Sequence, residues 1–541
     1  MSDPPAAVTD GSRARWQRPF QIAVIAALLG TAICFRLMYL SSMPGISGDE
    51  GWWGVQAIAW LSGQPFEART TSGNPIDLFF LIPLALVHAI APPSFLLLRI
   101  LPALVNLLAL AIGFWFVRRL YGSTTAWIYT VALAIMPTAI AHSRICQDPS
   151  QSVFWTTIVI CLCLLGLKER ARASAYFGGA LLIFLIAFWT HPTNVFIAPF
   201  LVLPFVAAVA RLLPSSRRQQ VIVFAVAALV TALVLSTALP ALGHLATPDQ
   251  HLDRAWLSMA RARMTDGGQW FEFAANNARL FNGVTIYHYF SGARPATVPY
   301  DTGFVIVVVA ALSGFFLTPV SRRSRLDYPL IFACAGTWIG FYAFAGPEAL
   351  RPHFERWGLC LIVPGTLVLA RGAATSIESM SRMRWLAIAA ATLVAAAMLA
   401  SFYVNYFREF ATTGGRSHLT YVTAATEPKQ QALEQILDRS PGPGAVTIVT
   451  RQWWLRWPMA YLATSHPNVS VSTSLDVERA PGFQEALGSG RLFFVEFVRT
   501  PELAAELDWI HARGLHAETT TVRDASGRDH LAIVQVMARV P

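Results

Sequence analysis

The sequence predicts a membrane protein in two parts: an all-α polytopic domain of about eleven transmembrane helices with further helices at its outer face, and a small C-terminal α/β domain. Of 541 residues, 55% are hydrophobic and only 13% are charged, which is too apolar for an ordinary soluble protein. The Arg and Lys residues fall in short clusters between membrane-length apolar runs. After Tyr403 the pattern changes to short β-branched runs in polar, Gly/Pro-rich surroundings.

The basic clusters predict the order and orientation of the spans. Although the formal net charge of +10 could suggest nucleic-acid binding, clusters in short loops instead orient membrane segments, so no nucleic-acid partner is expected. The first apolar run, Phe20–Leu40, is long enough to span and lacks a cleavage pattern. It is therefore predicted to be an uncleaved helix after a cytoplasmic tail, residues 1–19. Further spans are predicted at 95–117, 124–141, 152–167, 174–190, 195–211, 220–240, 302–319, 328–346, 358–371 and 385–403.

The apolar segment Ile76–Ala91 is predicted not to cross the membrane. It carries internal and flanking prolines, and a crossing here would place Arg118-Arg119 and most later clusters on the wrong side. We expect it to be re-entrant or to lie along the outer face. The membrane domain, residues 20–403, then has the topology of a multi-pass protein of the bacterial inner membrane with a cytoplasmic N-terminus.

The tail, residues 404–541, is predicted to be a soluble α/β domain on the periplasmic or extracytoplasmic side. Its strands are expected at Ala445–Val449, Leu492–Glu496 and Leu531–Val536, and an amphipathic helix at Glu502–Arg513.

The most informative motif is Asp49-Glu50, which follows the first span and opens a helical-looking stretch to Leu61. A carboxylate beside hydrocarbon is costly unless it faces a polar cavity, so both acids are candidate catalytic residues. The alternative is structural: Ser47 or Asp49 could cap a juxtamembrane helix that Trp52 anchors at the headgroups. Trp52 is also a candidate substrate-binding residue.

A second outer loop, His142 to Asp148, combines an acid with a cation. Asp148 precedes Pro149 and could simply start a helix. Arg144, four residues earlier, instead suggests that the loop binds an anionic headgroup. His142 is a candidate substrate-binding residue in the same loop.

A third outer segment supplies Arg351 and Arg356. A guanidinium fork matches phosphate oxygens, so both are candidates for binding the phosphate of a donor, with pairing to Glu348 or Glu355 as the structural alternative. His191, which precedes Pro192 at a helix end, is a further candidate for substrate binding.

In this order, the motifs resemble the class C glycosyltransferases of the protein O-mannosyltransferase and lipid A aminoarabinose transferase superfamily. The resemblance covers Phe20 to Tyr403. Two positions depart from the family pattern: the family often has Arg-Tyr at Arg356-Trp357 and Lys at His191. The matching features are Asp49-Glu50, Ser143-Arg144 with Asp148, Arg118–Gly122 on the inner side, and Glu355-Arg356-Trp357.

The resemblance implies transfer of a sugar from a polyprenyl-phosphate donor to an acceptor hydroxyl at the outer face, with inversion. Asp49 is expected to be the base, with Glu50 orienting Asp49 or the acceptor, and Arg144, Arg351 and Arg356 holding the donor phosphate. Asp148 is expected to position the acceptor or to ligate a divalent metal ion; the sequence leaves the need for a metal open, and no other cofactor is expected. The acceptor, a lipid, a glycan of the cell envelope such as lipopolysaccharide, or a protein, also stays open.

Two other functions are weighed. A lipid or sugar transporter or flippase would also be polytopic, but it would place ionisable residues near the midplane of its spans, whereas the acids here lie in outer loops. A non-catalytic scaffold would use the soluble tail to bind a partner.

Overall fold

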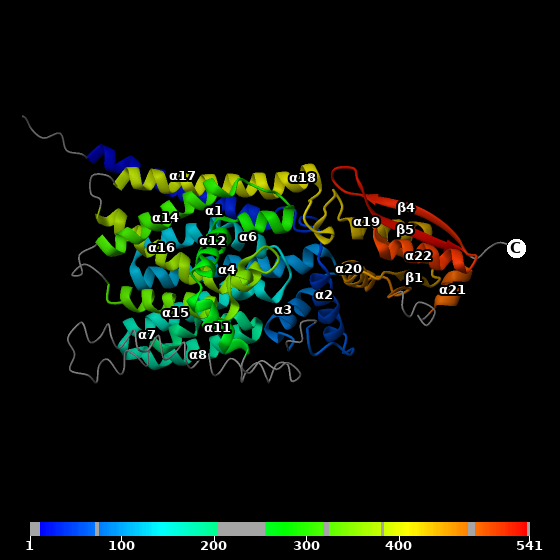
Figure 1. The fold of residues 1–541 in the computed structure, drawn as a ribbon, viewed down its shortest axis with the longest axis horizontal. Helices are drawn as coiled ribbons and strands as arrows, with labels where there is room; N and C mark the ends of the chain where they lie inside the picture. Colours follow the sequence, from blue (N-terminus) through cyan, green and yellow to red (C-terminus); the bar gives the residue numbers. More distant parts are fainter. Residues whose placement is uncertain are drawn as a thin grey trace, which may run out of the picture.

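The computed structural model describes residues 11–70, 75–203, 255–317, 324–379, 384–473 and 482–537. It is a bundle of long helices with a sheet domain at one end (Figure 1). Helix α1, which begins the described chain, starts at the end of the bundle opposite the sheet (Figure 1). We call the end that adjoins the sheet the outer end.

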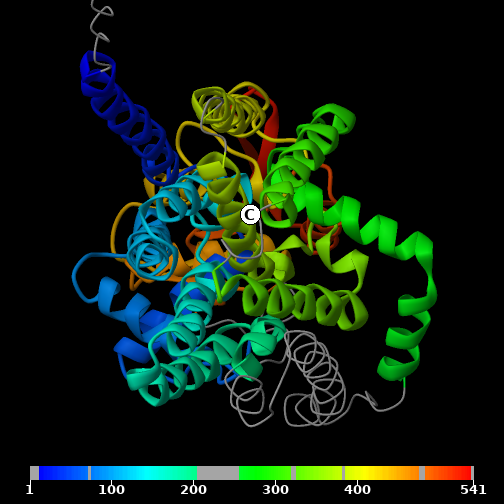
Figure 2. The ribbon, with the colours of Figure 1, turned by 90° about the vertical axis from the view of Figure 1, so that its left-hand side faces the viewer.

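The bundle consists of apolar helices that run along its length (Figures 1 and 2). Seven of the described helices are long and apolar enough to cross a membrane, and several shorter ones are apolar. Each span predicted outside residues 195–240 coincides with a helix, although 124–141 is divided at Met136 by Pro137. The bundle helices are α1 (Gly11–Leu37), α4 (Phe95–Tyr121), α5 (Ser123–Ile135), α6 (Pro137–His142), α7 (Ser152–Lys168), α8 (Ala173–Thr190), α14 (Thr297–Leu317), α15 (Asp327–Ala345), α16 (Leu359–Ser379) and α17 (Arg384–Phe402).

The structure describes only part of the two spans predicted between residues 195 and 240. An apolar helix runs over Pro192–Leu203, and the remainder of both predictions lies outside the described residues. Two further helices, α11 (Ala255–Thr265) and α12 (Gly267–Asn282), follow that gap and pack against the outer ends of α14 and α15.

Two short helices lie between α1 and α4 at the outer end. They are α2 (Gly48–Leu61) and α3 (Leu78–His88), which pack against each other (Figure 1). Helix α3 has 11 residues, about 16 Å at 1.5 Å per residue, which is too short to cross a bilayer. The segment predicted not to cross is therefore a short helix at the outer end.

The C-terminal domain is a five-stranded sheet in the order β2-β1-β3-β5-β4. Strand β1 is parallel to β2 and β3, and β5 is antiparallel to β3 and β4. The strands are β1 (Val446–Val449), β2 (Val469–Ser472), β3 (Leu492–Phe497), β4 (His516–Arg523) and β5 (Asp529–Met537), with α19 (Pro428–Arg439), α20 (Trp453–Ala463), α21 (Phe483–Gly488) and α22 (Pro501–Ala512).

The predicted strands and the predicted helix of this domain are confirmed as β1, β3, β5 and α22. The two strands without a prediction, β2 and β4, are the edges of the sheet. Each is partly or fully exposed along most of its length, so neither carries the apolar pattern of a buried strand.

The outer helices share a hydrophobic core with the sheet domain and with the first turn of α4, which supplies Phe95 and Leu98. Trp53 of α2 and Phe80 of α3 belong to the same buried cluster as Leu455 of α20 and Phe493 of β3. The hydroxyl of Tyr461 in α20 also lies 2.7 Å from His88 Nε2 at the end of α3. The sheet domain is thus fixed directly on the elements that carry Asp49.

Candidate active site at the outer end of the bundle

The start of α2 separates the roles of the two adjacent acids. Ser47 is the N-cap: its hydroxyl accepts a hydrogen bond from Glu50 N, and the Glu50 carboxylate accepts one from Ser47 N. This is a capping box, which satisfies two backbone donors at the helix start. Capping therefore occupies Ser47 and Glu50, while Asp49 takes no part in it.

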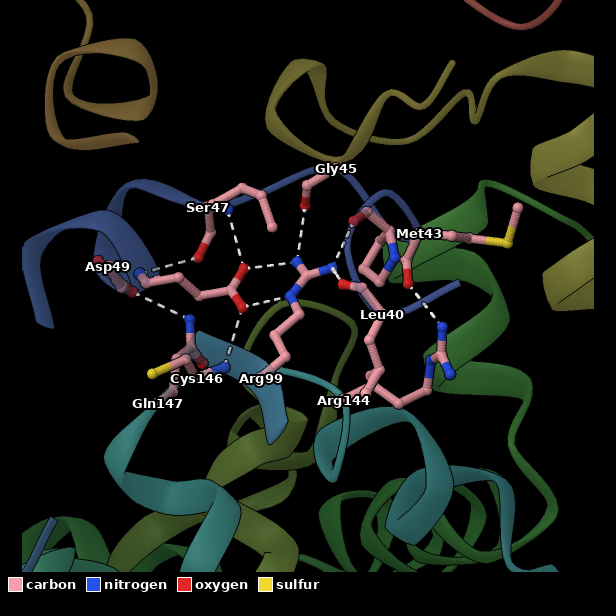
Figure 3. A network of polar contacts seen from close by, with 12 residues as sticks. Leu40, Met43, Gly45, Ser47, Asp49, Arg99, Arg144, Cys146 and Gln147 are labelled. Carbon is pink, nitrogen blue, oxygen red and sulfur yellow. Dashed lines mark hydrogen bonds and ion pairs between the residues drawn. The ribbon is translucent and has the colours of Figure 1, made fainter. Parts of the chain in front are cut away.

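Glu50 is also committed to a buried ion pair with Arg99 (Figure 3). The Nε and Nη2 of Arg99 each lie 2.7 Å from a different Glu50 oxygen, and both side chains are fully buried. Cys146 N donates to Glu50 Oε1 as well, at 2.9 Å. Because Glu50 has no free face, the expectation that it orients the acceptor is corrected; its carboxylate instead holds the first turn of α2, which carries Asp49.

Arg99 extends this network to the loop before α2. Its Nη1 donates to Leu40 O and Pro44 O at 3.1 and 2.8 Å, and its Nη2 donates to Gly45 O at 3.2 Å (Figure 3). Arg99 thus ties α4 to both the loop and the first turn of α2. It was not predicted from the sequence, although an arginine at the end of an apolar span signals a need for a partner.

Asp49 faces a partly open space among three donors. Its Oδ2 lies 3.2 Å from Gln147 Nε2 and 3.8 Å from Arg356 Nη1, and its Oδ1 lies 3.3 Å from Trp453 Nε1. Its side chain is 29% exposed. Burial raises the pKa of Asp49, while Arg356, the Trp453 hydrogen bond and His353 oppose that rise. A solvent-reachable carboxylate with a raised pKa is suited to general-base chemistry.

Arg356 lies opposite Asp49 in the short helix η7 (Glu355–Gly358). Its side chain is 28% exposed, and among the described residues its one ion pair is the long contact with Asp49. The guanidinium therefore has nitrogen atoms available for an anionic ligand.

Asp148 is brought to the same space by the short helix η1 (Asp148–Gln151). Asn106 of α4 fixes this helix, because its side chain donates to Ser150 O at 3.0 Å. The N-cap position is Gln147 and has no side-chain cap hydrogen bond. Asp148 is within electrostatic range of Asp49 and Arg356, so it adds a second carboxyl group to the site.

His191, at the end of α8, lies beside the group formed by Asp49, Arg356 and Asp148. Its Nδ1 lies 2.7 Å from the hydroxyl of Thr193. Burial lowers the pKa of His191 to about 3, and the charge of Arg356 adds to this effect. The imidazole is therefore neutral at physiological pH and can contribute a hydrogen bond but not a charge.

The other two predicted arginines lie outside this group. Arg144 is fully buried, and its Nη1 and Nη2 donate to Phe35 O and Met43 O at 2.6 and 2.7 Å. Arg351 is exposed and is paired with Glu272 through a 2.6 Å contact. Their predicted roles in phosphate binding need correction, because packing of the α1 loop occupies Arg144 and a surface ion pair occupies Arg351.

Two predicted substrate-binding residues also have structural partners. His142 is buried, with its Nε2 3.5 Å from the buried Glu355. Trp52 is 2% exposed and donates from Nε1 to Glu67 at 3.1 Å. His142 thus lies beside the helix that carries Arg356, and Trp52 packs in the core shared with the sheet.

The structure adds residues to the site that the sequence did not indicate. Gln147 is adjacent to the predicted Asp148, whereas Trp453 comes from the C-terminal domain, 404 positions from Asp49. Tyr289 is within electrostatic range of both Asp49 and Arg356, and its hydroxyl lies 3.1 Å from that of Tyr421. No sequence pattern could have placed residues from such distant segments together.

Within the described ranges, no group of three or more His, Cys, Asp or Glu side chains is arranged to hold a metal ion. Asp148 therefore offers one ligand to a metal ion, but the described residues around it do not complete a coordination set.

Comparison with known proteins identifies the fold. No protein-family model and no curated protein matches the sequence. The structure is similar to ArnT from Cupriavidus metallidurans in the apo state, with a TM-score of 0.53 and 11% identity over 96% of this chain and 98% of that one. The same protein bound to undecaprenyl phosphate gives a TM-score of 0.51 and 13% identity, covering 94% and 97%.

The archaeal oligosaccharyltransferase AglB from Archaeoglobus fulgidus, in complex with an inhibitory peptide and a dolichol-phosphate, gives a TM-score of 0.49 at 12% identity, over 89% of this chain and 70% of that one. The likeness to ArnT extends over nearly the whole of both chains, including the sheet domain. The predicted resemblance is thus confirmed at the level of the fold: the chain has the fold of ArnT, which is the class C glycosyltransferase (GT-C) fold.

Proposed function

We propose that this protein transfers a sugar from a polyprenyl-phosphate donor to an acceptor hydroxyl at the outer face of the bacterial inner membrane. The observation that carries the proposal is the pairing of Asp49 with Arg356, 3.8 Å apart and both partly exposed, at the outer end of a GT-C bundle. The solved ArnT that shares this fold was captured with undecaprenyl phosphate, which supports a lipid-phosphate carrier here as well.

Asp49 is the proposed general base. It removes the proton of the acceptor hydroxyl as that oxygen attacks the anomeric carbon of the donor sugar. The bond between the anomeric carbon and the phosphate oxygen breaks, and the electron pair leaves with the prenyl phosphate. Attack from the face opposite the phosphate inverts the anomeric configuration. The proton on Asp49 is then lost to solvent through its exposed edge.

Arg356 is the proposed phosphate-binding residue. Without donor, its charge lowers the pKa of Asp49. A donor phosphate competes for the same guanidinium, so its binding offsets that charge and makes Asp49 a stronger base in the loaded enzyme. Asp148 and neutral His191 are proposed to orient the two substrates by hydrogen bonds.

The alternative function, a lipid or sugar transporter, is less well supported. The charges of the candidate site lie at the outer end of the helices rather than near their midplane.

A reconstituted system separates the two functions. Proteoliposomes given a radiolabelled polyprenyl-phosphate sugar and an envelope extract should form a labelled product that is no longer prenyl-linked. Label that only crosses the bilayer, still attached to its lipid, would favour transport.

Replacing Arg356 by Ala should weaken use of the donor. The loss of a charge-assisted contact of about 1.5–3 kcal/mol predicts an increase of roughly tenfold or more in the donor KM, or an equivalent fall in kcat. The matched control is Arg351→Ala, which removes only an exposed pair with Glu272. Donor kinetics that are unchanged in Arg356→Ala, or equally impaired in both variants, would reject this assignment.

The proposed orientation can be tested by labelling in intact cells. With the exposed Cys34 replaced by Ala, the remaining described cysteines are buried. A cysteine at Ser489, exposed in the sheet domain, should react with a membrane-impermeant thiol reagent from outside. One at Ser123, exposed between α4 and α5, should react only after permeabilisation, because the arginines before it favour the cytoplasmic side. The reverse pattern would place the site in the cytoplasm.

A further inference from the structure

We propose that the C-terminal domain forms part of the active site, with Trp453 as a positioning residue that fixes the orientation and the basicity of Asp49. This inference rests on the proposed role of Asp49 as the base. It assigns to the soluble domain a direct part in the chemistry.

The two oxygens of Asp49 have different surroundings. Oδ1 accepts a hydrogen bond from Trp453 Nε1 at 3.3 Å, whereas Oδ2 faces Gln147 and the long contact with Arg356. An indole N–H can only donate, so Trp453 favours the ionised carboxylate. With Oδ1 held by the soluble domain, Oδ2 is the oxygen that faces the proposed phosphate-binding residue.

A row of glycines on α2 allows α20 to approach closely. Gly48, Gly51 and Gly54 recur at a spacing of three and so lie along one side of α2. A Cβ added at Gly48 would lie 2.4 Å from the Trp453 ring, and one at Gly51 would lie 2.3 Å from the backbone nitrogen of Pro458.

A Cβ at Gly54 would lie 2.4 Å from the ring of Tyr461, one further turn along α20. The two helices therefore meet at backbone distance at Gly51, while Gly48 and Gly54 leave room for the rings of Trp453 and Tyr461 to pack directly on α2; we call this row the glycine seam. Because the contact is this close, the position of α20 sets the position of Trp453 on Asp49.

The sheet in turn fixes α20. The helix follows β1, and the connecting residue Arg451 donates its backbone N–H to the buried carboxylate of Glu496 in β3. Leu455 and Met459 of α20 are fully buried in the domain. Trp453 is thus held at the end of a rigid support that reaches from the sheet to the membrane domain.

Several other charged or titratable groups act on Asp49 and stay in place when Trp453 is changed. They are Arg356 in η7, His353 before it, Glu50 in α2, Asp148 in η1, and Tyr289 and Tyr421 across the site. A change confined to the indole N–H therefore isolates the contribution of Trp453.

The test is the pH dependence of kcat/KM in Trp453→Phe, measured with the full-length protein in proteoliposomes. Phenylalanine keeps an aromatic ring but lacks the donor. Loss of one hydrogen bond to the Asp49 carboxylate should raise its pKa. The acid limb, which is the fall in kcat/KM at low pH, should therefore move to higher pH by about one unit, and activity should recover as the pH rises. The matched control is Trp454→Phe, because Trp454 packs on His418 and the structure gives it no contact with Asp49. Its profile should match that of the wild type.

A second variant approaches the same contact from the other helix. Gly51→Ala should push α20 away and move the acid limb in the same direction, whereas Gly178→Ala, which meets no atom within 4 Å, should not. A purely structural role for Trp453 predicts equal loss of activity at every pH, and that result, or an unchanged acid limb, would overturn the inference. Asp49→Asn measured in parallel separates the two failures, because only an active Asp49→Asn would also reject the proposed base.

Discussion

Asp49→Asn is expected to reduce sugar transfer by about 10²–10⁴-fold while the protein still folds and inserts, because loss of a general base typically has this effect. Asparagine has the shape of aspartate and can still accept from Trp453, whose Nε1 lies 3.3 Å from Asp49 Oδ1. The change therefore removes the proton acceptor with little disturbance of the contacts around it. Initial rates of transfer from a labelled prenyl-phosphate sugar measure the effect.

The same variant should also change how the rate of transfer depends on pH. Because burial raises the pKa of Asp49, wild-type activity should fall as the pH drops through a value above the ordinary range for an aspartate. The residual rate of Asp49→Asn should lack this acid limb. Activity within a few-fold of the wild type, with the limb retained, would exclude Asp49 as the base.

Arg99→Met is expected to destabilise the protein by about 3–5 kcal/mol, the typical effect of removing one partner from a buried ion pair. The substitution leaves the fully buried Glu50 without its counter-charge and releases the loop carbonyls that Arg99 binds. The midpoint of thermal denaturation of the purified protein in detergent should fall clearly. Activity should fall with it, because Asp49 is adjacent to Glu50 in α2.

The control for this prediction is Arg523→Met. Arg523 pairs with Asp529 in the sheet domain, but the two side chains are 69% and 46% exposed, so its loss should change the stability by less than about 1 kcal/mol. The double variant Glu50→Gln/Arg99→Met should recover part of the loss, since no charge is left buried. Equal midpoints for Arg99→Met and Arg523→Met would contradict the structural role of the pair.

The fold was predictable from the sequence wherever burial imposes a pattern. Long apolar runs predicted the bundle helices, and short runs of β-branched and other apolar residues predicted β1, β3 and β5. The exposed edge strand β4, with three consecutive threonines, has no such pattern, because only pairing with β5 makes it a strand.

The site was only partly predictable. Asp49 and Glu50 are equivalent as sequence, and the difference between them arises from Arg99, which lies 49 positions from Glu50. Arg144 matched the expected motif, yet the fold places it in the packing around the end of α1. Trp453 reaches the site only because the sheet domain docks on α2 through the glycine seam.

The most direct test of the central claim is release of free polyprenyl phosphate by proteoliposomes that contain a labelled polyprenyl-phosphate sugar and an envelope acceptor extract. The proposed chemistry predicts one polyprenyl phosphate released for each sugar transferred by the wild type, and a fall in both products of about 10²–10⁴-fold in Asp49→Asn. Sugar that crosses the bilayer without release of polyprenyl phosphate, or equal release by both proteins, would contradict the account.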